Sequence, residues 1–191
     1  MNSFFRAAAG LVLMSSAIFM VGCAGPAANY SPSIANVETL KKGNIVASNV
    51  GSITVAATVQ GGTSVRLRAH TMESPIGSNF GDYIANALRQ ELELAKLIDT
   101  KSSTVISGEL LRNEMDSSGI STGEGQIEAH FLVKRDGQIR FDKVKRADHK
   151  WESAFVGGIA IPNAIRAYPE LVQKLITALV ADSEFVNALK K

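Results

Sequence analysis

The stretch QIEAHFLVKRDGQIRF, residues 126–141, indicates the fold of this chain more clearly than any other segment. Apolar side chains recur at every second position from Ile127 to Val133, which is the period of a strand with one buried face. Asp136-Gly137 follows, and this dipeptide favours a two-residue type I′ turn because both residues tolerate positive φ. We therefore predict an antiparallel hairpin whose return strand begins at Gln138.

Alternating segments on the N-terminal side predict the rest of the sheet. Residues 53–59 and 65–69 alternate on either side of a Gln-Gly-Gly-Thr turn, which predicts another hairpin. Residues 104–114 are rich in strand formers, and Gly108 within them indicates a bulge or a close approach. The glycine-rich residues 117–125 open a strand and not a helix, so we predict a flexible strand connection instead of a phosphate-binding loop. We interpret one stripe of polar side chains as a solvated strand face: Arg66, Arg68 and His70.

Two apolar stripes with a 3.6-residue period predict the helices. The first covers residues 80–97, with Asn79 and Asp82 as a capping pair and Glu91 at the edge of the stripe. The second covers residues 165–180 and contains Pro169, so this helix either starts near Tyr168 or is kinked there.

Asp182 and Ser183 can cap a final short helical turn that carries three apolar side chains. Together the segments predict an α+β domain: a mainly antiparallel sheet of about five strands packed against two helices as a two-layer sandwich.

The first 22 residues have the pattern of a secretory signal. One basic residue, Arg6, precedes a mostly apolar run over residues 7–19. The run is short and interrupted compared with the roughly 20 apolar residues of a membrane-spanning helix, so a signal anchor is the weaker alternative. Residues 20–23, Met-Val-Gly-Cys, resemble the lipobox of bacterial lipoproteins, although lipoboxes favour Leu where Met20 stands, which implies less efficient processing.

The lipobox resemblance implies cleavage between Gly22 and Cys23, with a diacylglycerol on the Cys23 sulfur and a further acyl chain on its amine. Two or more acyl chains hold a protein stably on a membrane. By the sorting rule of enteric bacteria, a residue other than Asp after the cysteine favours the outer membrane, facing the periplasm, over the inner membrane; here that residue is Ala24.

We divide the chain into residues 1–22 as signal peptide, 23–43 as acylated N-terminus and flexible tether, and 44–191 as a single periplasmic domain. The tether is predicted from its prolines, serines and small residues. The alternative is a short helix over this segment that docks on the domain through Ile34, Val37 and Leu40, which have helical spacing.

Composition excludes several classes of protein. Removal of the signal leaves 169 residues (191 − 22), enough for one domain with a core, and a formal charge near +1, too small for a general nucleic-acid binder. The single cysteine excludes an internal disulfide. The three histidines lie in no catalytic or zinc-binding motif, so we expect no enzymatic activity, no metal site and no cofactor.

Basic residues are concentrated in residues 134–150, which contain seven Lys or Arg and three Asp. Such a cluster can attract anionic groups, or it can protect an exposed edge strand from aggregation. We select five of these residues as the candidate interaction surface: Arg140, Lys143, Lys145, Arg146 and Lys150.

The lipobox, the helical segment Tyr83–Leu92 and the C-terminal segments Trp151–Phe155 and Ala181–Val186 together resemble the YajG-type bacterial lipoproteins. More distantly, the order of elements is similar to small envelope lipoproteins that assist lipopolysaccharide export or lipid transport. The resemblance implies an α+β domain tethered at the outer membrane and carries over no catalytic residue.

Our leading hypothesis from the sequence is a non-enzymatic lipoprotein that is attached to the membrane through its lipid anchor and binds an envelope protein or assists envelope assembly. The alternative is a binding module for an amphipathic ligand such as lipid, lipopolysaccharide or a glycan strand. A protein-binding domain would have a filled core and an exposed patch, whereas a ligand-binding module would have an apolar pocket with a basic rim.

Overall fold

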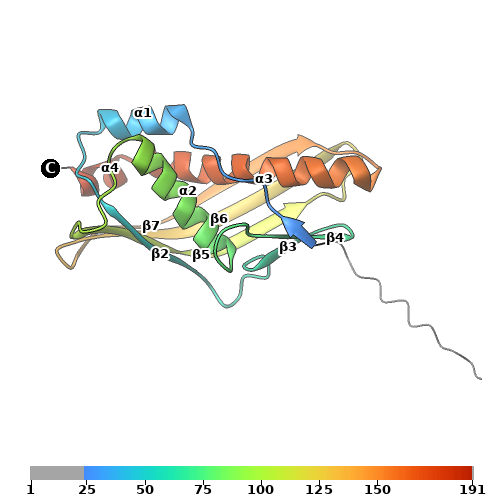
Figure 1. Cartoon of the computed structure of the whole chain (residues 1–191), viewed down its shortest axis with the longest axis horizontal. Helices are drawn as coiled ribbons and strands as arrows, with labels where there is room; N and C mark the ends of the chain where they lie inside the picture. Colours follow the sequence, from blue (N-terminus) through green and yellow to red (C-terminus); the bar gives the residue numbers. More distant parts are fainter. Residues whose placement is uncertain (1–23, 191) are drawn as a thin grey trace, which may run out of the picture.

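The computed structural model describes residues 24–190. It confirms the α+β class, with two sheets on one side and four helices on the other (Figure 1). The larger sheet has the order β2-β5-β6-β7, with β2 parallel to β5 and the other neighbours antiparallel. Its strands are β2 (Asn49–Val55), β5 (Thr104–Asp116), β6 (Thr122–Arg135) and β7 (Gln138–Glu152).

The hairpin predicted at residues 126–141 is confirmed as the turn between β6 and β7. Asp136 and Gly137 have φ values of 52° and 78°, the positive values that a type I′ turn requires. The side chains of Ile127, Phe131 and Val133 are buried on the face toward the helices. Gly108 is the predicted close approach, because a Cβ there would lie 2.2 Å from the carbonyl oxygen of His130.

The predicted hairpin of residues 53–59 with 65–69 is wrong. Strand β2 instead pairs in parallel with β5, and the second segment belongs to a smaller sheet of order β1-β4-β3. That sheet contains β1 (Ala24–Pro26), β3 (Ser64–Leu67) and β4 (His70–Glu73), with β1 parallel to β4. Alternation indicated a strand in each segment, although β2 ends at Val55 and Ala57 is exposed, and it carried no information about which strands are neighbours.

The connection predicted over residues 117–125 is shorter than expected. Strand β5 ends at Asp116 and β6 begins at Thr122, so only residues 117–121 connect them. Gly123 is buried within β6, and a Cβ there would lie 2.4 Å from the ring of Trp151. Glycine is therefore required at this point of the strand so that the indole can lie across it.

The four helices are α1 (Ile34–Lys42), α2 (Phe80–Leu94), α3 (Gly157–Val180) and α4 (Ser183–Leu189). The predicted Asn79 cap of α2 is confirmed, because its side chain accepts a hydrogen bond from the amide of Asp82 at 3.0 Å. A helix start near Tyr168 is wrong: α3 is continuous from Gly157 through Pro162 and Pro169. A proline inside a helix costs about 3 kcal/mol, and the buried stripe on both sides of Pro169 offsets that cost.

Aromatic rings fill the centre of the layer between helices and sheet. The Tyr168 ring lies 4.8 Å from that of Phe80 and 5.3 Å from that of Tyr83, centroid to centroid, and all three side chains are essentially inaccessible to solvent. Phe141 and Phe185 make a second edge-to-face pair at 5.4 Å, which packs α4 against β7. These contacts make a filled core.

The flexible tether expected over residues 23–43 is wrong for residues 24–43, which contain β1 and α1. Cys23 itself lies outside the described residues. The alternative of a docked helix is confirmed. Strand β1 pairs with β4, and α1 buries Val37 and Leu40 while Ile34 remains exposed. The segment is therefore part of the domain, because its apolar side chains complete the core.

Glu91 of α2 joins this N-terminal segment to the domain. Expected at the edge of the stripe, it is fully buried. Its Oε1 accepts hydrogen bonds from the hydroxyl of Tyr30 at 2.5 Å, the amide of Ser33 at 2.9 Å and the Nδ2 of Asn36 at 3.2 Å. Burial, followed by the hydrogen bond to Glu91, raises the pKa of Tyr30 far above its ordinary value, so this hydroxyl remains a donor.

Substitution of Glu91 tests this junction. Glu91→Ala should lower the free energy of unfolding by about 3 kcal/mol, because two buried donors and one partly buried amide lose their acceptor. The expected fall in Tm is about 6–12 °C, measured by circular dichroism. Glu91→Gln keeps an acceptor oxygen and should cost only about 1 kcal/mol. Equal losses in the two variants, or unchanged hydrogen exchange of the α1 amides in Glu91→Ala, would contradict this role.

Candidate functional site

Strand β7 carries all five residues selected from the sequence, and it is an outer strand of the four-stranded sheet. The structure does not bring the five together on one surface. Lys143 and Lys145 lie on the face that packs against the helices, as their partners on α4 show. Arg146 and Lys150 lie on the opposite face, and Arg140 is at the hairpin end of the strand.

On the helix-covered face, two lysines bind the start of α4. Lys145, with a side chain only 15% exposed, donates to Asp182 Oδ2 at 2.5 Å. Lys143 lies 2.7 Å from Glu184 Oε1 and 3.6 Å from Asp182 Oδ2. The hydrogen bond from Lys145 is the main reason that the pKa of Asp182 falls to about 2. These two lysines therefore hold α4 on the sheet.

On the open face of the sheet, carboxylates from neighbouring strands pair with the cations. Arg146 Nε lies 2.8 Å from Glu128 Oε2, and Lys150 Nζ lies 3.7 Å from Glu124 Oε2. His130 Nε2 lies 2.5 Å from Asp142 Oδ1 on the same face. Cross-strand pairs of this kind neutralise most of the positive charge that the sequence concentrates here.

The hairpin end is the most exposed part of β7. Arg140 has no carboxylate within ion-pair distance among residues 24–190, and the adjacent Ile139 side chain is mostly exposed. Arg140 borders an open hollow of about 400 Å³ together with residues of α4. Val144, four residues further along the strand, is also exposed.

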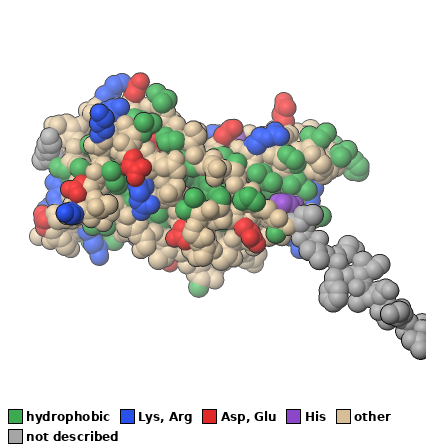
Figure 2. All heavy atoms as spheres, viewed as in Figure 1, with side chains coloured by type: hydrophobic (Ala, Val, Ile, Leu, Met, Phe, Trp, Pro, Cys, Tyr) green, Lys and Arg blue, Asp and Glu red, His purple; other side chains and the backbone are tan. Residues whose placement is uncertain are grey.

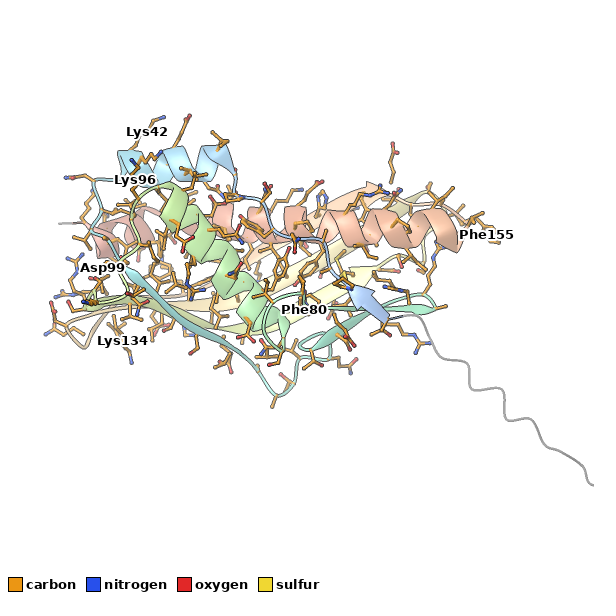
Figure 3. The ribbon with its side chains drawn as sticks, in the orientation of Figure 1. Lys42, Phe80, Lys96, Asp99, Lys134 and Phe155 are labelled. Carbon is orange, nitrogen blue, oxygen red and sulfur yellow. The ribbon has the colours of Figure 1, made fainter. Side chains whose placement is uncertain are left out.

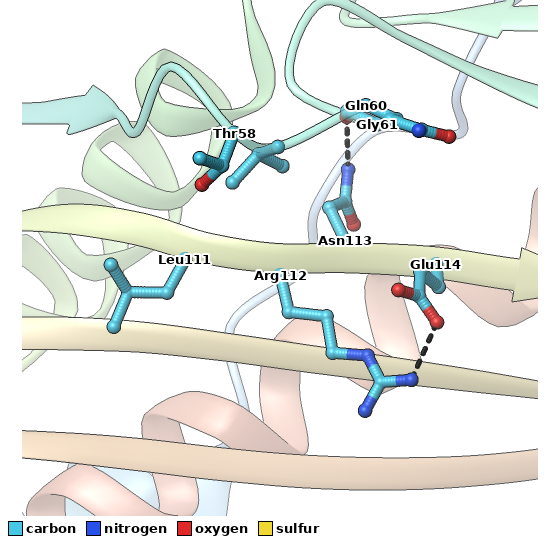
Figure 4. A pocket seen from close by; sticks show the side chains of 8 residues that line it. Thr58, Gln60, Gly61, Leu111, Arg112, Asn113 and Glu114 are labelled. Carbon is cyan, nitrogen blue, oxygen red and sulfur yellow. Dashed lines mark hydrogen bonds and ion pairs between the residues drawn. The ribbon is translucent and has the colours of Figure 1, made fainter.

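A second hollow, which the sequence did not reveal, lies where β2 ends. Val55 is the last residue of β2 paired with β5, opposite Leu110, so β5 continues beyond its partner. The connection after β2 crosses this region, and Asn113 Nδ2 donates to the carbonyl of Gly61 at 2.8 Å (Figure 4). Two adjoining hollows of about 320 and 430 Å³ remain; polar groups predominate in the smaller one, and polar and apolar groups line the larger one about equally. In the sequence, the only sign of these two hollows is Asn113, an amide that is buried within an apolar alternation.

The described residues hold no group of three His, Cys, Asp or Glu placed to bind a metal ion. The histidines have separate surroundings: His130 pairs with Asp142, and His149 lies 3.1 Å from Glu170. Burial is the main cause that lowers the pKa of His149, with Lys174 adding to it and Glu170 opposing it. The histidines thus form no common site.

Within residues 24–190, no helix has both the length and the apolar character needed to span a bilayer.

The fold belongs to a class of α+β domains with an antiparallel meander and helices on one face. A crystal structure with a similar fold is that of protein XCC0632 from Xanthomonas campestris, which is assigned to family DUF330. The TM-score is 0.58 at 12% sequence identity, over 86% of this chain and 96% of that one. No family model matches the sequence, and no curated protein matches it. The similarity at this identity concerns the fold alone.

The Asp182 ion pair predicts an acid dependence of stability. Because the folded pKa of Asp182, about 2, lies below the ordinary value of 3.8, its contribution is present above pH 4 and is lost as the pH falls toward 2. Asp182→Asn keeps a capping oxygen without the charge and should lower Tm by about 2–4 °C at pH 7.

The difference in Tm between wild type and Asp182→Asn should shrink between pH 4 and pH 2, as thermal unfolding at a series of pH values would measure. Asp99→Asn is the control, because Asp99 is exposed and its side chain accepts only the amide of Lys101. A difference that stays constant down to pH 2 would contradict the role of the charge.

Proposed function

We propose that this protein is a non-enzymatic lipoprotein of the bacterial envelope, anchored through acylated Cys23, whose domain binds a protein partner along the hairpin half of β7. The observation that carries the binding role is the position of β7. This strand of 15 residues is paired on one side, by β6, and no other strand lies on its outer side within residues 24–190.

The C-terminal part of the β7 edge is covered by α3. Asn163 Nδ2 donates to the carbonyl of Glu152 at 3.0 Å, and Lys174 Nζ lies 3.5 Å from the carbonyl of Asp148. The part from Gln138 to Arg146 lacks such cover and carries two exposed apolar side chains, Ile139 and Val144, beside Arg140. An open edge with exposed apolar side chains beside an arginine suits the addition of a partner strand.

The shape of the core favours a protein partner over an amphipathic ligand. The space between sheet and helices is filled by the rings of Phe80, Tyr83 and Tyr168. The hollows described above are open to solvent, whereas a lipid or glycan site of the alternative kind needs an enclosed apolar pocket.

The anchor is proposed from the lipobox resemblance of residues 20–23, and the resemblance to YajG-type lipoproteins is part of the same proposal. Ala24, the next residue, is exposed in β1, which is compatible with a lipid anchor directly before it. Because residue 24 is not Asp, the proposed location is the outer membrane, facing the periplasm.

Replacement of Cys23 tests the anchor. In a bacterial host, wild type should fractionate with the outer membrane and its N-terminal peptide should carry acyl chains by mass spectrometry. Cys23→Ala should carry none and should be lost from the outer-membrane fraction, because it has no acceptor for the lipid. Outer-membrane recovery of Cys23→Ala equal to wild type would contradict the anchor.

Site-specific crosslinking tests the edge of β7. A photoreactive amino acid at Val144 in the acylated protein should give a defined crosslink to an envelope protein in intact cells, whereas one at Leu94, equally exposed on α2, should not. Arg140→Glu should reduce the Val144 crosslink roughly tenfold if about 1.4 kcal/mol of binding depends on it. Lys41→Glu, an exposed charge reversal on α1, is the control. A crosslink that is equally strong at Leu94, or insensitive to Arg140→Glu, would contradict the edge as the binding surface.

A further inference from the structure

One end of the molecule exposes a group of large apolar side chains, here called the apolar tip. It comprises Ile120, Phe155, Val156 and Ile159, which are 72%, 78%, 59% and 54% exposed. Phe155 lies at the end of the molecule where α3 begins, opposite the end that carries Lys96, Asp99 and Lys134 (Figure 3). Apolar side chains also gather at that end in the space-filling view (Figure 2). A concentration of exposed apolar side chains on one small region indicates contact with another apolar surface.

A single guanidinium fixes the two loops that carry the apolar tip. Arg68, in the turn between β3 and β4, donates to the carbonyls of Ser117 and Gly119 in one loop, at 2.6 and 3.1 Å. It also donates to the carbonyls of Ala154 and Phe155 in the other, both at 2.7 Å. Arg68 has φ of 57°, so the backbone itself adopts an uncommon conformation to place this side chain. The apolar residues are thus presented by ordered loops.

The first residues of α3 expose apolar side chains at a position where a polar capping residue would stabilise the helix. Val156 occupies the N-cap position and makes no side-chain capping hydrogen bond. Ser, Thr, Asp or Asn at an N-cap stabilises a helix, whereas Val does not. Its side chain is also directed to solvent, so neither capping nor core packing accounts for Val156 at this position.

The described N-terminus lies toward the same end of the molecule as the apolar tip. Ala24 pairs with Thr71 of β4, and Thr71 pairs with Arg66 of β3, two residues before Arg68. β1 accordingly lies near the β3–β4 end of the molecule (Figure 1). Consecutive Cα atoms are about 3.8 Å apart, so an acylated Cys23 would hold Ala24 within one residue of the lipid. The domain then has no spacer that could keep this end away from the bilayer.

We propose that the apolar tip inserts into the lipid surface next to the acyl chains of Cys23, and so fixes the orientation of the domain on the membrane. This inference rests on the anchor proposed above. The occupant is a bilayer, because the chain enters the domain at this end, and apolar side chains that project from ordered loops can enter the acyl boundary. With the tip inserted, α3 runs from the membrane surface outward. The hairpin end of β7, at the far end of the domain, then remains accessible in the periplasm.

The test uses the full acylated chain, in which the Cys23 thiol is blocked and Phe155→Cys supplies the only thiol. An environment-sensitive fluorophore is attached there, and the protein is reconstituted into vesicles of phosphatidylethanolamine and phosphatidylglycerol with spin-labelled acyl chains. We expect blue-shifted emission and strong quenching from residue 155. The same label on Leu94→Cys, an exposed apolar position at the C-terminus of α2, should emit as in water and remain unquenched.

Val156→Ser in the Phe155→Cys protein separates membrane contact from a structural role. It supplies a helix cap, so Tm should be unchanged or higher, while quenching of the label should fall. If acylation is intact by mass spectrometry and the label at residue 155 is unquenched, the tip inference is wrong and the anchor stands. If Cys23 carries no acyl chain, the anchor and the tip inference are both wrong. Quenching that is equal at residues 155 and 94 would also overturn the inference.

Discussion

The buried carboxylate of Glu91 is the interaction on which the arrangement of this molecule depends. One oxygen accepts three donors from residues 30–36 and binds a segment that is remote in sequence to the last turn of α2. Because a buried donor without an acceptor is unfavourable, these three hydrogen bonds hold the segment in its docked position. That position gives β1 its place beside β4, and it determines where the chain preceding Ala24 leaves the domain.

The second constraint is the division of charge between the two faces of β7. Consecutive residues of a strand point to opposite faces, so a run of basic residues in sequence is not a basic surface in space. Lys143 and Lys145 are used to hold the cap of α4, whereas Arg146 and Lys150 are balanced by carboxylates of β6. The hairpin end with Arg140, where charge is accompanied by exposed apolar side chains, is therefore the part of β7 that we propose as a binding surface.

Features with a local cause could be predicted from the sequence. The β6–β7 hairpin follows from alternation and from Asp136-Gly137, and the start of α2 follows from Asn79. Features with a non-local cause could not. The parallel pairing of β2 with β5 joins segments about 55 residues apart, and the sequence of neither strand identifies the other as its neighbour. Glu91 was expected at the edge of a stripe because its donors lie in a segment predicted to be flexible. Arg68 was read as part of a solvated face, although its four acceptors are backbone carbonyls, which the side-chain pattern does not encode.

The separation in sequence between Glu91 and its donors also orders the steps of folding. The meander of β5, β6 and β7 closes short loops, whereas the contacts of Tyr30 and Asn36 with Glu91 span 61 and 55 residues. Long loops cost more entropy to close and their contacts form later. The N-terminal segment is therefore expected to dock after the β5–β6–β7 meander has formed, together with the other long-range pairing, that of β2 with β5.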